Sequence, residues 1–204
     1  LQSKLGGASQ AQIGKLKQLC EQERDWEYLA PYLNVLQLSG RRRERMLELE
    51  KLMREPGCHR SVPILYALEA CVVEDLDRAL ELLLTTQFSA THGGGLLSYS
   101  HVRLRRLRAE RALAQGDLAA ARVELDAAEP ILHHFQEDVQ VLKCKAALHG
   151  TRAKLEELSG NAPAAKKCYE AALEEEHDLR SPQRLYQAHA MIKLGRVEEG
   201  QALI

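Results

Sequence analysis

The chain has 204 residues, of which 45% are hydrophobic and only 4% aromatic, and its 28 basic residues nearly balance its 29 acidic ones. This balance gives no net field that would attract nucleic acid or an anionic membrane, so both are disfavoured as partners. No apolar run approaches the ~20 residues that span a bilayer, and the first residues lack the basic start and apolar middle of a secretory signal. We therefore expect a cytoplasmic protein with no membrane partner.

The composition favours helices, because Ala, Leu, Glu and Arg recur throughout while aromatic residues and prolines are few. The five cysteines form an odd set without a C-x-x-C pair, and Cys71 and Cys168 lie inside helical patterns where a small apolar residue would serve. We expect them to be reduced thiols.

Apolar periodicity and turn residues predict helices that come in pairs. A lone helix over 10–24 follows Ser9, a suitable N-cap, and we interpret residues 1–25 as half of a preceding repeat. Five pairs are predicted within residues 26–204: 26–38 with 42–54, 62–73 with 76–87, 100–114 with 118–129, 139–158 with 162–176, and 183–194 with 197–204. The last helix stops early, so we expect the chain to be part of a larger protein.

A repeat underlies these pairs. Its reference positions, in the turn between the two helices of each pair, are Gly40, Glu74, Gly116, Gly160 and Gly195. The intervals between them are 34, 42, 44 and 35 residues. The two long intervals contain the connections 88–99 and 130–138, and insertions of this kind collect on one face of a repeat array, often the binding face.

The same residue sizes recur around each turn. Seven residues before it stand Ala67, Ala109, Ala153 and Ala188, and five residues after it stand Ala79, Ala121, Ala165 and Gly200. Nine residues after it stand Leu83, Leu125, Tyr169 and Ile204, and twelve after it Thr86, Ala128 and Ala172. Two helices joined by a tight turn approach closely only where facing residues are small, and a large side chain one turn further fills the groove.

The first pair departs from this pattern, because Leu33 and Arg45 occupy its two small positions. We expect this pair to be splayed or packed differently, and its standing as a repeat is open.

The recurring pattern resembles the tetratricopeptide repeat, a helix–turn–helix unit with small residues at the close contacts. The second-helix starts that carry the resemblance are Leu76-Asp77-Arg78-Ala79 and Leu118-Ala119-Ala120-Ala121 after Gly116-Asp117. The resemblance covers roughly residues 26–204 and implies an all-α protein: an α-solenoid of antiparallel helix pairs wound into a superhelix. More narrowly, residues 76–204 resemble the C-terminal repeat region of large bacterial proteins whose N-terminal part is a sugar-mutarotase-like β-sandwich of unknown function.

Three functions are compatible with such an array. We expect a scaffold that binds a peptide or partner protein in the concave groove of the repeats, with no catalysis, cofactor or metal. The alternatives are a helical sensor or effector region of a bacterial transcription regulator and an accessory repeat module of a carbohydrate-active protein. A DNA-binding helix-turn-helix encoded elsewhere in the parent gene would favour the regulator.

Two motifs resemble catalytic or metal sites but lack the necessary partners. The run His92–Gly95 matches the oxyanion loop of lipases, yet the sequence contains no G-x-S-x-G nucleophile, so we interpret the run as a joint. His133, His134, Cys144 and His149 offer metal-ligand side chains, but their spacing matches no standard zinc site. We predict no metal site.

Two further clusters favour ordinary surface roles. Cys58 and His59 follow Pro56-Gly57, and adjacent side chains rarely face one another, so a turn is favoured over a thiol–imidazole pair. Arginines gather at Arg41–Arg43 and along 103–111, but the second set spreads around its helix without interleaved aromatic residues. An ion-paired surface is favoured over a nucleic-acid footprint.

The concave groove of stacked helix pairs is lined by the first helix of each pair. Counting away from the small positions on these helices gives the polar residues that the core does not use. The predicted partner-binding residues are Arg103, Arg106, Glu110, Lys154, His189 and Lys193. The lysine–asparagine clamp that some tetratricopeptide proteins use for C-terminal carboxylates is not recognisable in this chain.

Overall fold

The computed structural model describes residues 10–23, 25–56, 58–59, 61–73, 75–85, 96–130, 132, 135, 145–174 and 183–204. Across these ranges the regular structure is helical and contains no strand, which confirms the all-α prediction. The chain divides into two compact units, Leu1–Ser89 and Ala90–Ile204, and each is described by itself.

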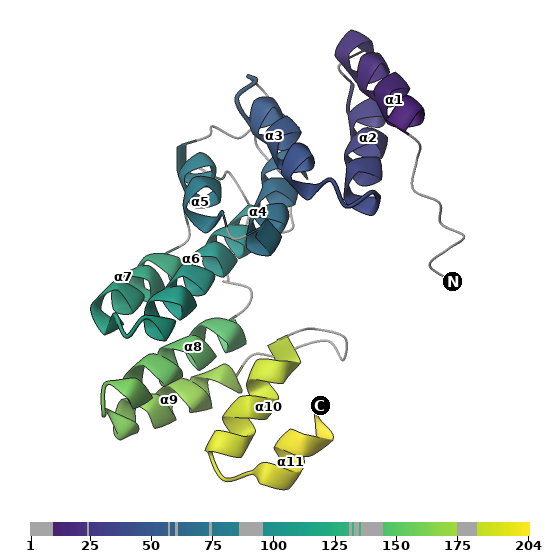
Figure 1. The fold of residues 1–204 in the computed structure, drawn as a ribbon. Helices are drawn as coiled ribbons and strands as arrows, with labels where there is room; N and C mark the ends of the chain where they lie inside the picture. The colour runs from purple at the N-terminus through teal and green to yellow at the C-terminus, as the bar shows by residue number, and fades with distance from the viewer. Residues whose placement is uncertain are drawn as a thin grey trace. The chain divides into compact units, whose positions relative to one another are not determined.

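Neighbouring helices pack in pairs within each unit (Figure 1). The first unit contains α1 (Gln10–Glu23), α2 (Trp26–Leu38), α3 (Arg42–Met53), α4 (Ser61–Val73) and α5 (Leu76–Thr85). The second contains α6 (Leu96–Ala114), α7 (Leu118–Ala128), α8 (Lys145–Leu158), α9 (Ala162–Ala172), α10 (Gln183–Lys193) and α11 (Val197–Ala202). Among the described helices, none is both long enough and apolar enough to cross a bilayer.

Several predicted boundaries are wrong by a few residues. Helix α6 begins at Leu96 rather than at 100, because Leu97 is buried and extends the stripe of His101 and Leu104 by one turn. Helices α9 and α11 end before their predicted limits of 176 and 204. The predicted start of α8 at 139, most of the connection 88–99 and the whole run His92–Gly95 lie outside the described residues.

The connection 130–138 was predicted as an insertion between helix pairs, and one of its described residues contributes to the core. Phe135 is fully buried, and its ring meets that of His101 edge-on with the centroids 6.0 Å apart. Burial of a large aromatic side chain is strongly favourable in free energy, which draws this part of the connection inward. The connection therefore both links two helix pairs and supplies a side chain to the core.

Four of the five reference turns share one backbone geometry. Gly40, Gly116, Gly160 and Gly195 have φ angles of 72°, 78°, 74° and 85°, the left-handed region that a side chain disfavours. In each turn the N–H of the residue after the glycine donates to the carbonyl five residues back, over 2.8–2.9 Å, as in a Schellman motif. The turn therefore ends one helix and reverses the chain into the next.

The predicted small positions lie where paired helices touch. Ala67, Ala109, Ala153 and Ala188 are each at most 3% exposed, as are Ala79, Ala121 and Ala165. Gly200 shows the closest approach, because a Cβ added there would lie 2.7 Å from the backbone oxygen of Ala188. The larger residues Leu83, Leu125 and Tyr169 are buried as predicted, but Ile204 is 79% exposed because α11 ends before reaching it.

The first predicted pair, α2 and α3, uses its large residues in another way. Leu33 is fully buried, and the Arg45 side chain is buried with its guanidinium ion-paired to Glu69 of α4. Arg42 also reaches Glu69, at 3.3 Å. The arginine in the small position therefore connects α3 to α4.

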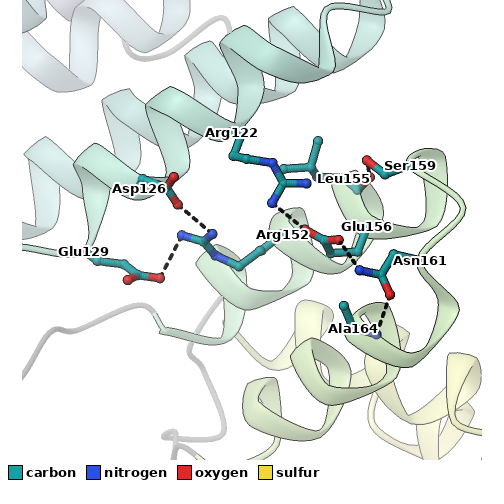
Figure 2. A network of polar contacts seen from close by, with 9 residues as sticks. All are labelled: Arg122, Asp126, Glu129, Arg152, Leu155, Glu156, Ser159, Asn161 and Ala164. Carbon is teal, nitrogen blue, oxygen red and sulfur yellow. Dashed lines mark hydrogen bonds and ion pairs between the residues drawn. The ribbon is translucent and has the colours of Figure 1, made fainter.

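In the second unit, polar side chains connect one helix pair to the next (Figure 2). Arg122 of α7 donates to Glu156 of α8 over 2.7 Å, and Arg152 of α8 donates to Asp126 and Glu129 over 2.8 Å each. Glu156 also accepts from Asn161, whose side chain caps α9. These contacts hold α8 in place beside α7, and α6 and α10 each contact α8 as well.

We expect Gly200→Ala to destabilise the second unit by about 1–3 kcal/mol, because its methyl group would overlap the Ala188 carbonyl oxygen and Ile192. Gly150→Ala is the matched control in the same unit. Its new Cβ would make an ordinary 3.4 Å contact with Tyr186, and it should be neutral or stabilising by up to about 1 kcal/mol. Calorimetric unfolding measures both, and equal effects would contradict close packing at Gly200.

We expect Glu69→Ala to destabilise the first unit by about 3–5 kcal/mol, because the buried Arg45 guanidinium would lose its counter-ion. The double variant Arg45→Met with Glu69→Leu should recover most of this loss, since no charge is then left buried. Urea unfolding followed by the fluorescence of Trp26, the single tryptophan, reports on this unit. A double variant as unstable as the single one would contradict the explanation.

Candidate functional site

The candidate site is a polar surface on α6, α8 and α10, the first helices of the three pairs in the second unit. We call it the first-helix face and define it by Arg103, Arg106, Glu110, Thr151, Lys154 and Tyr186. Direct contacts join four of these residues across the three helices. Three come from α6, two from α8 and one from α10.

Arg106 occupies the centre of this face. Its guanidinium carbon lies 5.2 Å from the ring centroid of Tyr186 on α10, within the range of a cation–π contact. The same guanidinium is ion-paired with Glu110, one turn further along α6. The residue is only 8% exposed, so its guanidinium is engaged within the chain, and a contact between Arg106 and a partner stays a prediction. Its role on this face is to hold Tyr186 and Glu110.

Thr151 joins α8 to the same cluster. Its hydroxyl oxygen lies 3.2 Å from a Glu110 carboxylate oxygen and 3.1 Å from the Ala147 carbonyl oxygen, so its single proton can serve either acceptor. Glu110 is thus held from both α6 and α8, and its carboxylate has a defined position.

Tyr186 presents a half-buried ring with a hydroxyl that stays protonated at neutral pH. Burial raises the pKa of this hydroxyl, while the nearby positive charges of Arg106 and Arg103 act in the opposite direction. Arg103 therefore lies close to Tyr186 as well. Gly150 of α8 makes room for the ring, since a Cβ at that position would lie 3.4 Å from it.

Helix α10 is positioned by amide side chains. The side-chain oxygen of Gln183 accepts from the backbone N–H of Ala147 near the start of α8, over 3.0 Å, and Gln183 is itself buried. The side-chain nitrogen of Gln187 donates to the carbonyl of Ala172 at the end of α9, over 3.4 Å. These bonds satisfy backbone groups at the start of α8 and the end of α9, and they fix the position of Tyr186 on α10.

The two predicted residues on α10 have other contacts. The exposed ring of His189 meets Tyr169 of α9 edge-on, with centroids 5.9 Å apart. Lys193 is ion-paired with Glu157 at 2.9 Å and lines a cavity of about 300 Å³ beside Tyr169 and Leu194. His189 and Lys193 therefore interact with α9 and with the end of α8, whereas Arg106 contacts both Glu110 and Tyr186.

Two cations of the first-helix face have no counter-ion among the described residues. Within the described ranges, Arg103 and Lys154 form no ion pair, whereas Arg106, Glu110 and Lys193 all do. Lys154 is exposed and Arg103 half-buried. The sequence prediction missed Thr151 and Tyr186, although each lies three residues from a predicted residue and thus one turn away on its helix.

The other sequence candidates have structural roles where they are described. The His59 ring stacks on Trp26 with centroids 4.2 Å apart, and its Nδ1 accepts from the backbone N–H of Ser61, as in a turn. Arg105 and Arg108 both pair with Glu124, so this part of the arginine cluster is ion-paired as predicted.

The structure describes only some of the residues predicted as metal ligands or as reduced cysteines. His133, His134 and Cys144 lie outside the described residues, and within the described part no three His, Cys, Asp or Glu side chains are grouped to hold a metal. Cys20, Cys58 and Cys168 are free thiols.

A smaller cavity of about 210 Å³ lies in the first unit among α1, α2 and α3. Its charged rim is largely satisfied, because Lys17 and Lys51 both pair with Glu48. The Tyr32 hydroxyl beside it has no hydrogen-bond partner, but it is shielded even from water.

We expect His149 of α8 to make the second unit less stable as the pH falls below about 6.5. Burial lowers the pKa of this half-buried imidazole in the folded chain, with Glu129 and Glu174 opposing the shift and Arg152 and Lys145 adding to it. The unfolded chain then binds the proton more readily, so acidification favours unfolding. His149→Gln should show a smaller loss of thermal stability between pH 7 and pH 5. An unchanged pH dependence would contradict the burial effect.

Comparison with known proteins gives no relative. No family model matches the sequence, and neither curated proteins nor solved structures include a match. The resemblance to tetratricopeptide repeats and to mutarotase-associated repeat regions therefore stays a prediction, and any functional argument depends on the contacts and charges of the first-helix face.

Proposed function

We propose that this chain is a tetratricopeptide-like α-solenoid that acts as a protein-interaction scaffold, and that a peptide or partner protein binds along the first-helix face. The proposal has two parts, an architecture and a binding surface, and each has its own support. It assigns no catalytic role to the described residues.

Recurrence supports the architecture. The pairs α6–α7, α8–α9 and α10–α11 each reverse at a left-handed glycine, and each buries a small residue before and after that turn. Helix α8 contacts both α6 and α10, so the first helices of successive pairs are neighbours. Stacked units of this kind present their first helices on one continuous surface, which repeat proteins use for binding.

One observation carries the binding proposal: beside an ordered polar cluster lie two cations that have no counter-ion among the described residues. The contacts among Arg106, Glu110, Thr151 and Tyr186 hold the centre of the face in a defined arrangement. Arg103 and Lys154 belong to the same face and have no counter-ion within the described chain. An ordered surface that presents uncommitted donors and an aromatic ring is suited to recognition, because little side-chain entropy is lost on binding.

Hydrogen exchange with selected peptides tests the proposal. Peptides enriched from a random library against the full chain should slow amide exchange or alter its pattern in α6, α8 and α10 more than in α7 and α9. Lys154→Trp, which places a bulky ring on the face, should weaken binding at least about fivefold. The control Lys167→Trp on α9 should leave affinity unchanged. Failure to enrich any peptide, or protection confined to α7 and α9, would overturn the proposal.

A further inference from the structure

We infer that the segment bound by the first-helix face is acidic, with two carboxylate side chains about four or five residues apart in an extended chain. This inference rests on the proposed function and specifies its partner. It is argued from two cations, Arg103 and Lys154, that form no ion pair among the described residues, and from the distance between them along the helices.

The charges of the face support an anionic partner. The carboxylate of Glu110 is engaged by Arg106 and Thr151, and that of Glu157 near the end of α8 is engaged by Lys193. The charges that remain, Arg103 and Lys154, are both positive. An incoming carboxylate would meet each of them without having to displace an existing ion pair.

Helix geometry sets the spacing. Thr151 contacts Glu110, so these residues mark the same level on α6 and α8. Arg103 lies seven residues before Glu110, and Lys154 lies three residues after Thr151. With a rise of about 1.5 Å per residue the two cations lie roughly 15 Å apart along the helices. An extended chain advances about 3.3 Å per residue, so four or five residues bridge that distance.

The surroundings favour a carboxylate-bearing protein segment over nucleic acid. Neighbouring arginines on α6 already have a counter-ion within the chain, since Arg105 and Arg108 both pair with Glu124. A nucleic-acid strand carries a phosphate at every nucleotide, whereas the face offers only two cations that form no ion pair among the described residues. A peptide with two separated carboxylates matches these two cations, and the half-buried ring of Tyr186, which lies against Arg106 on the same face, can pack against its apolar residues.

Fluorescence polarisation with synthetic peptides tests this inference on the full chain. The probe is a ten-residue peptide with an amidated C-terminus, a tetramethylrhodamine label and two glutamates separated by three residues drawn from leucine and alanine. Two further probes carry glutamines at the same positions or the two glutamates side by side. We expect the spaced glutamate probe to bind about tenfold more tightly than the glutamine probe, and more tightly than the adjacent one, with an affinity that falls as salt rises.

Matched variants then localise the effect. The double variant Arg103→Gln with Lys154→Gln should weaken the spaced glutamate probe about tenfold and change the glutamine probe by less than about twofold. Lys167→Gln on α9 removes an exposed lysine that has no ion pair among the described residues, and it should change either probe by less than about twofold.

The outcomes separate the two proposals. Equal affinity for glutamate and glutamine probes, with α6, α8 and α10 still protected in hydrogen exchange, would overturn the acidic partner and leave the interaction function standing. Equal weakening by Lys167→Gln and by the double variant would also overturn it, as would an anionic oligonucleotide that displaces the probe more effectively than free glutamate peptide. If no probe binds and no library peptide is enriched, both proposals fail.

Discussion

The structure of the second unit depends on close contact between two paired helices at positions where neither can carry a large side chain. At Gly200 even one methyl group would overlap the Ala188 carbonyl. Because packing forces fall off steeply with distance, this proximity determines how much surface each pair buries. It also determines which residues remain outward. The small positions of α6, α8 and α10 face the second helices of their pairs, which leaves polar positions on the same three helices outside that contact.

Ion pairs connect successive helices in both units, but they differ in burial and in number. In the first unit the buried contact between Arg45 and Glu69 replaces small-residue packing and connects α3 to α4. In the second unit Arg122 and Arg152 connect α7 to α8 over a partly exposed surface, where each contact is individually weak but several together fix an orientation (Figure 2). One buried ion pair thus fixes α3 against α4, whereas several partly exposed ion pairs together fix α7 against α8.

Local features could be predicted from the sequence, whereas contacts between distant helices could not. The turn at Gly116 and the buried position of Ala109 follow from residue size and backbone preference, which act over a few residues. The burial of Phe135 and the contact of Arg106 with Tyr186 depend on how far one helix pair is rotated against the next. That rotation is set by many side chains at once, so spacing along one helix identified Arg106 but not its partner.

The four glycine turns are self-contained, because the hydrogen bonds that close each one join residues at most five positions apart. Each turn therefore terminates its helix without help from neighbouring helix pairs. A gene segment that encodes one helix pair therefore also encodes the glycine turn that ends its first helix and reverses the chain. Duplication or loss of such a segment would therefore add or remove one helix pair while leaving the other turns intact.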